Sequence, residues 1–141
     1  MQEVQEVPEQ TDICRPNADA ENLFIVLCAS GFENPARVRS ALMFASLAAS
    51  ADHRTILYCI QNAVDIMVKG SVEKQERAEN GSPTILQRLQ EALEMGVEIQ
   101  CCTQTMANKN IAPGDLLQGV TPAGAMSLID LASHAKGSLC F

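Results

Sequence analysis

Short runs of apolar residues alternate along this chain with longer segments whose apolar residues recur at helical spacing. Residues 23–30 and 55–60 are apolar over almost their whole length. Runs of this length without alternation are typical of parallel strands that are covered on both faces. Residues 97–101 instead alternate between apolar and polar side chains, as in a strand with two different faces. Two brief strands are expected around residues 116–121 and at residues 139–141.

The segments between these runs predict helices at about residues 34–50, 63–69, 82–95 and 122–134. The first helix is apolar nearly all round, so we expect it to contact the sheet on one side and another subunit on the other. Ser82 is expected to be the N-cap residue of the third helix. In the last helix the residues expected to face inward are Ala125, Met126, Leu128, Ile129 and Ala132.

Strands and helices alternate throughout, and this order predicts an α/β protein. The expected fold is a single flavodoxin-like parallel sheet of about five strands with helices on both faces. Residues 23–141 are expected to form this domain, and no internal repeat is found in the sequence. Residues 1–22 are expected to be an acidic, flexible tail, because they carry six acidic side chains against one arginine and show no periodicity. Cys14 lies in this tail.

The charge and composition exclude several classes of protein. A net charge of −7 and an aromatic content of 4% are unsuited to direct binding of nucleic acid. No apolar stretch reaches the roughly 18 residues of a membrane span, and the acidic start lacks the apolar core of a secretory signal. We therefore expect a cytoplasmic protein, in which the six cysteines need not form disulfides. The chain also lacks the glycine-rich motifs that bind nucleotide phosphates.

Two adjacent cysteines end the third long strand. Ligands of such sheets bind at the carboxyl ends of the strands, so these thiols are the candidates for chemistry. Alternation places Cys101 on the buried side of the strand and Cys102 on the opposite side, at the rim. A helix that begins directly after Cys102 would stabilise its thiolate through free N–H groups. By contrast, Cys28, Cys59 and Cys140 lie in apolar runs and are expected to act as small buried hydrophobes.

Simpler interpretations of the cysteine pair stay open at this point. Both cysteines can be merely small residues at a strand end, and a vicinal disulfide is geometrically awkward. A metal shared between subunits would need further ligands, and His53 and His134 are each isolated along the sequence. The acidic residues of the domain are scattered and predict no pair of catalytic carboxylates, and no Gly-x-Ser-x-Gly motif of a serine hydrolase is present.

The order of motifs around the third strand is similar to that of a known family. Residues 96–99 (GVEI), 102–106 (CTQTM) and 116–120 (LLQGV) give a strand that ends in cysteine, a Thr-Met pair and a Gly-Val strand. This pattern resembles the DsrE/DsrF-like family. The resemblance covers about residues 23–141, with further similarities at residues 33–35, 62–64 and 139–141. The departures from the family pattern are Ala63 in place of glycine, the polar residues 108–110, the long loop 71–81 and the additional thiol of Cys101.

The resemblance implies a sulfur carrier or sulfurtransferase that holds sulfane sulfur as a persulfide and passes it to a partner protein. Cys102 is the implied acceptor of sulfur, and Cys101 is the second candidate. The residues expected to bind substrate are Gly31, Asn62, Thr103, Thr105 and Met106. The resemblance also implies trimers or hexamers, sulfur donor and acceptor proteins as partners, and neither a metal nor an organic cofactor.

Two other functions stay open. The chain can be a non-catalytic DsrE-like scaffold or small-ligand-binding subunit of a larger assembly. It can also be a thiol redox sensor that uses Cys101 and Cys102.

Overall fold

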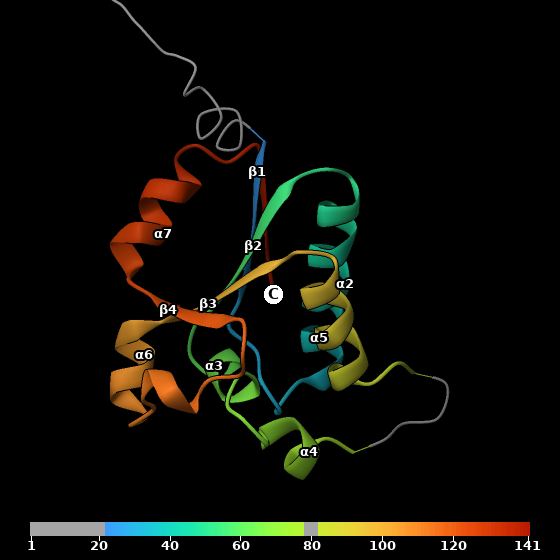
Figure 1. Ribbon diagram of the computed structural model, residues 1–141, viewed down its shortest axis with the longest axis vertical. Coiled ribbons are helices and arrows are strands. Elements are labelled where there is room, and N and C mark those ends of the chain that lie inside the picture. The colour runs from blue at the N-terminus through green and yellow to red at the C-terminus, as the bar shows by residue number, and fades with distance from the viewer. Residues whose placement is uncertain (1–21, 78–81) are drawn as a thin grey trace, which may run out of the picture.

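The computed structural model describes residues 22–77 and 82–141, which contain one parallel sheet of five strands (Figure 1). The strands are β1 (Leu23–Cys28), β2 (Arg54–Cys59), β3 (Glu98–Cys102), β4 (Val120–Ala123) and β5 (Gly137–Cys140). The expected α/β architecture is thereby confirmed. The acidic tail and Cys14 lie outside the described residues.

Helices cover both faces of the sheet. On one face, α2 (Pro35–Ser50) and α5 (Ile85–Glu94) lie side by side, and on the opposite face lies α7 (Ala125–Ala132) (Figure 1). The short helices α3 (Ala63–Ile66), α4 (Ser71–Gln75) and α6 (Thr103–Asn108) lie beyond the carboxyl ends of the strands. A single 3-10 turn, η3 (Pro113–Asp115), precedes β4.

The strand order of the sheet is β4-β3-β2-β1-β5. From β1 to β4, each strand lies beside the one before it, and only the connection that contains α7 returns across the sheet to the far side of β1. The reversal of direction therefore falls between β1 and β5. In flavodoxin itself, with the order 2-1-3-4-5, the reversal falls between the first and third strands.

The alternation of side chains along the strands divides the core in two. Val26, Leu57 and Ile99 point toward α2 and α5 and belong to the larger cluster. Ile56 and Tyr58 point to the other face, where α7 covers them in part with Leu128, Leu131 and the nearby Ala135. The second cluster is smaller, so this face is less completely covered than the first.

Three buried cysteines form a row across neighbouring strands. Cys28 pairs in register with Cys59, and Cys59 pairs in register with Cys101. All three side chains lie in the cluster beneath α2, with exposed fractions of 3%, 0% and 0%. The expected burial of Cys28 and Cys59 is confirmed, whereas that of Cys140 is wrong. Cys140 is exposed because β5 is an outer strand of the sheet, paired with β1 on one side.

Several details of the helices differ from the sequence-based expectations. The N-cap residue of α5 is Thr84 rather than Ser82, and its hydroxyl accepts a hydrogen bond from the N–H of Gln87. Helix α7 begins at Ala125 because residues 120–123, including a proline, belong to β4. Met126 and Ile129, which were expected to face inward, are 77% and 60% exposed.

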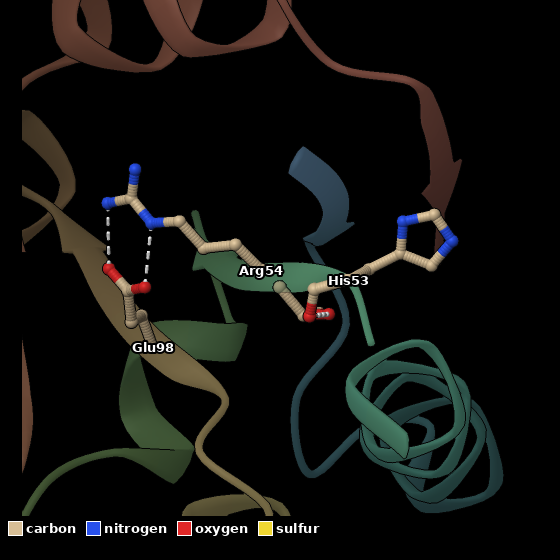
Figure 2. Close-up of polar contacts among 4 residues, drawn as sticks. His53, Arg54 and Glu98 are labelled. Atoms are coloured by element: carbon tan, nitrogen blue, oxygen red, sulfur yellow. Dashed lines mark hydrogen bonds and ion pairs between the residues drawn. The ribbon is translucent and has the colours of Figure 1, made fainter. Parts of the chain in front are cut away.

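An ion pair joins the amino ends of β2 and β3. Figure 2 shows the Arg54 guanidinium donating two hydrogen bonds to the Glu98 carboxylate, at 2.9 and 3.0 Å. Both side chains are more than one-third exposed, so the pair contributes at most about 1 kcal/mol to stability. The neighbouring His53 ring points away from this pair and lies 5.4 Å from the ring of Phe24, measured between ring centroids.

Within residues 22–77 and 82–141, no helix combines the length and apolar character that crossing a membrane requires.

Candidate functional site

The two adjacent cysteines point to opposite faces of the sheet at the end of β3. Cys101 is fully buried in the core beneath α2, whereas Cys102 belongs to the smaller cluster on the other face and is 8% exposed. Cys102 is the last residue of β3, and helix α6 begins at the next residue. The predicted alternation is therefore confirmed. This geometry also directs the two sulfur atoms away from each other, which disfavours a vicinal disulfide and a redox sensor based on it.

Several hydrogen-bond donors surround the sulfur of Cys102. Burial raises the pKa of this thiol, but hydrogen bonds from the N–H and hydroxyl of Thr105, the hydroxyl of Tyr58 and the N–H of Gln104 lower it. The net result is a Cys102 pKa below its ordinary value. Hydrogen bonds to a charged group are stronger than those to a neutral one, so this donor set favours the thiolate over the thiol.

Thr105 connects the sulfur to the end of the neighbouring strand. Its hydroxyl oxygen accepts a hydrogen bond from the N–H of Gln61, at 3.2 Å, while the hydroxyl proton is directed at Cys102. Gln61 follows β2 with a φ of 51°, a left-handed conformation that turns its N–H toward α6. The chain thus holds the first turn of α6 against the end of β2, which fixes the donors around Cys102.

Tyr58 lies on β2, the strand beside that of Cys102, and its side chain belongs to the same buried cluster as Cys102. The ring is 1% exposed, and its hydroxyl donates a hydrogen bond to the carbonyl oxygen of Ala123, at 2.9 Å. Burial above all, and then the neighbouring Cys102, raise the pKa of Tyr58. The phenol therefore stays protonated and remains a donor. Sequence reasoning missed Tyr58 because it lies within an apolar run. The alternation along β2 was the signal that could have identified it, because Tyr58 is the only hydroxyl-bearing residue on the Ile56 face of β2.

The residues expected to bind substrate lie at the same end of the sheet but in different surroundings. Gly31 lies against Asn62, since a Cβ added to Gly31 would come within 2.2 Å of the Asn62 carbonyl oxygen. Thr103 is exposed at the start of α6, and Thr105 contacts the sulfur of Cys102. Met106 is 4% exposed and packs in the core beneath α2, where it anchors α6.

No set of three or more histidine, cysteine, aspartate or glutamate side chains is close enough to hold a metal ion in the part of the chain that the structure describes.

The pH dependence of alkylation tests the electrostatics of this site. Cys102 is expected to react with iodoacetamide at lower pH than an ordinary thiol, because its lowered pKa increases the fraction of thiolate. This advantage is present below the ordinary pKa of 9.0 and is lost as the pH rises above it, where an ordinary thiol is ionised as well. Peptide mapping of partly alkylated protein measures the rate, with the exposed Cys140 as the internal control. Rates that rise in parallel for both thiols would contradict the prediction.

The sheet and the cysteine at its rim define an α/β protein with a candidate nucleophilic thiol at the carboxyl end of a parallel strand. The chain belongs to the DsrE/DsrF-like family, whose model matches residues 22–141. The recognised resemblance is thereby confirmed over the whole described domain, and the family supports a role in sulfur relay in general terms. No protein with a curated description matches the chain.

Several solved structures share this fold. The crystal structure of the ychN protein from E. coli has 19% sequence identity and a TM-score of 0.69, and the match covers 85% of this chain and 98% of that one. A conserved protein of unknown function from Bacteroides thetaiotaomicron, BT1422, has 13% identity and a TM-score of 0.61, over 87% and 97% of the two chains. A protein of unknown function from Methanobacterium thermoautotrophicum, MTH1491, has 14% identity and a TM-score of 0.59, over 84% and 97%.

Proposed function

We propose that this protein is a sulfur carrier that holds sulfane sulfur as a persulfide on Cys102 and passes it to a partner protein. The observation that carries the proposal is the donor set on the Cys102 sulfur, which favours the thiolate at a site still 8% exposed. A thiolate is the species that attacks another sulfur atom. Cys101 is the weaker candidate for this role because its side chain is fully buried on the opposite face. The reducing cytoplasm, where thiols persist, suits this chemistry.

The proposed transfer follows the course of thiol–disulfide exchange. The Cys102 thiolate attacks the outer sulfur of a donor persulfide, R–S–SH. A bond forms between the Cys102 Sγ and that sulfur, the donor S–S bond breaks, and its electron pair leaves on R–S⁻. When sulfur is passed on, an acceptor thiolate attacks the outer sulfur and the electron pair returns to the Cys102 Sγ. There is no net oxidation or reduction, and the transferred sulfur carries its proton with it.

The surroundings of Cys102 suit a partner protein as donor and acceptor. Thr103 and Asn62 are exposed, and Gly124 is half-buried, with space for a Cβ 4.0 Å from the Thr103 hydroxyl. Gly31 holds the loop after β1 close to Asn62. In the proposal these residues form the rim over which the partner presents its sulfur, and Met106 holds α6 in place beneath it.

Intact mass spectrometry tests the proposal directly. Reduced protein incubated with a low-molecular-weight persulfide, then freed of the donor, is expected to gain one sulfur atom per chain. Peptide mapping after alkylation is expected to place this sulfur on the peptide that contains Cys102. A protein that gains no sulfur, or gains it on Cys140, would contradict the proposal.

Exposed apolar side chains favour association of this chain with further copies. Phe44 and Leu47 on the outer side of α2 are 40% and 54% exposed, which agrees with the expectation that this helix contacts another subunit. Met126 on α7 is exposed as well. In the proposal the carrier is a homo-oligomer, with three or six copies implied by the family resemblance. Light scattering measures the mass in solution.

A scaffold subunit without catalysis would associate but take up no sulfur. Light scattering and intact mass spectrometry together therefore distinguish a scaffold from a sulfur carrier.

A further inference from the structure

The Tyr58 hydroxyl has one proton and two acceptors within reach. It donates to the carbonyl oxygen of Ala123 at 2.9 Å, and it lies in the same buried cluster as Cys102, where hydrogen bonding from the phenol lowers the pKa of the Cys102 thiol. The sheet register brings these acceptors together, because Cys102 of β3 is paired directly with Ala123 of β4. A phenol can donate only one hydrogen bond at a time, although its oxygen can also accept. The hydroxyl can therefore donate its hydrogen bond to the carbonyl or to the sulfur, but not to both at once.

The charge on the sulfur decides this choice. A neutral thiol is a weak acceptor, so the carbonyl of Ala123 is the better partner, and the thiol can donate its own proton to the phenol oxygen. A thiolate is charged, and charge-assisted hydrogen bonds are roughly twice as strong as neutral ones. Tyr58 is 1% exposed, so the Ala123 carbonyl and the Cys102 sulfur compete for its proton with little interference from water.

We propose that Tyr58 is a catalytic residue whose hydroxyl turns from the Ala123 carbonyl to the Cys102 sulfur when that sulfur becomes negatively charged. This inference rests on the proposed function and adds a residue that stabilises the Cys102 thiolate of the carrier without sulfur. In the persulfide the Cys102 Sγ is bonded to the outer sulfur and carries no charge, so the hydroxyl returns to Ala123. Tyr58 therefore stabilises the carrier without sulfur more than the carrier with sulfur.

This preference affects the two half-reactions differently. When sulfur is passed on, the Cys102 thiolate is the leaving group, and a leaving group that is better stabilised departs faster. When sulfur is taken up, the same thiolate is the nucleophile, and stabilisation makes it less nucleophilic once it is fully ionised. A residue that only supports the fold would change both rates in the same direction.

The titratable groups that act on the hydroxyl are few. The phenol interacts with Cys102 and with Cys101 and Cys59. Cys101 and Cys59 lie on the opposite face of the sheet, in the core beneath α2. The carbonyl of Ala123 on β4 and the donors of α6 carry no charge, so Cys102 is the group whose ionisation moves the hydroxyl proton.

Single-turnover kinetics of the Tyr58→Phe variant test the proposal. At a pH where Cys102 is fully ionised, transfer of sulfur to an acceptor thiol is expected to slow about threefold to tenfold, because one hydrogen bond to the leaving group is lost. Uptake from a low-molecular-weight persulfide at the same pH is expected to be unchanged or up to about threefold faster. The pH midpoint of Cys102 alkylation is expected to move upward. Equal slowing of both half-reactions, or an unmoved midpoint, would overturn the proposal.

Ultraviolet absorption of the unmodified chain gives a second test that needs no substitution at Tyr58. The chain contains one tyrosine and no tryptophan, so the near-ultraviolet tyrosine band belongs to Tyr58 alone. A phenol that donates to an anion absorbs at longer wavelength than one that donates to a carbonyl. The band is expected to shift with the same pH midpoint as Cys102 alkylation, and not to shift in the Cys102→Ser variant. A band whose position does not change when Cys102 ionises would refute the proposed change of hydrogen-bond acceptor.

The two proposals fail in distinguishable ways. If the protein takes up no sulfur, the carrier function is wrong, while the tyrosine band still decides whether the hydroxyl follows the charge. If sulfur is taken up but neither the band nor the rate of transfer depends on Tyr58, the carrier function stands and the role of Tyr58 is wrong.

Discussion

The Cys102→Ser variant is expected to take up no sulfur from a low-molecular-weight persulfide, whereas the unmodified chain gains one sulfur atom per chain. Serine fits the same position, but its hydroxyl remains protonated at neutral pH and cannot form a persulfide. The donors on this position, from Thr105, Tyr58 and Gln104, stay in place around the smaller oxygen. Intact mass spectrometry after removal of the donor measures the uptake, and circular dichroism shows whether the variant is folded.

The neighbouring cysteine supplies a matched control. Cys101→Ser changes the same atoms one residue earlier, on a side chain that is fully buried beneath α2. This variant is expected to keep its sulfur uptake, although a hydroxyl in an apolar core lowers the free energy of unfolding by about 1–3 kcal/mol. Uptake that survives in Cys102→Ser and disappears in a folded Cys101→Ser would transfer the proposed role to Cys101.

Gly31→Ala is expected to lower the free energy of unfolding by about 1–3 kcal/mol through overpacking. A Cβ at this position would lie 2.2 Å from the carbonyl oxygen of Asn62, and backbone atoms cannot move aside as a flexible side chain can. The loops after β1 and β2 must then separate. Because the adjacent Gln61 donates its N–H to Thr105, this separation is expected to disturb the donors on Cys102 as well.

Urea denaturation measures the loss of stability, and the pH midpoint of Cys102 alkylation reports the effect on the site. Gly114→Ala is the matched control, because nothing lies within 4 Å of the Cβ that it adds. Its stability is expected to change by less than about 0.5 kcal/mol. Equal stability of the two variants would show that the close approach of Gly31 to Asn62 carries no constraint.

Much of the candidate site follows from local pattern. The alternation of residues 97–101 is a property of any extended strand, and it places Cys101 and Cys102 on opposite faces of the sheet without knowledge of the neighbouring strands. The apolar runs at the first two strands likewise identify a sheet that is covered on both faces. These features depend on side chains a few residues apart, so the sequence determines them directly.

The rest depends on contacts between distant parts of the chain. Tyr58 belongs to the site only because β2 lies beside β3, and because Ala123, 65 residues further along, pairs with Cys102. The place of β5 beside β1 also cannot be read from an alternation of strands and helices, which fits several strand orders. For α7 the apolar residues surround most of the helix, so the pattern did not show that Leu128 and Leu131 pack on the sheet while Met126 and Ile129 face outward.

The buried thiols of Cys28, Cys59 and Cys101 can report on the separation of the strands during unfolding. These thiols have exposed fractions of 3%, 0% and 0%, so a labelling reagent reaches them only when the strands separate. Each reports on a different strand, and their labelling rates at increasing urea show whether β1, β2 and β3 open together or in succession. The native chain thus allows its cooperativity to be measured strand by strand, without any engineered probe.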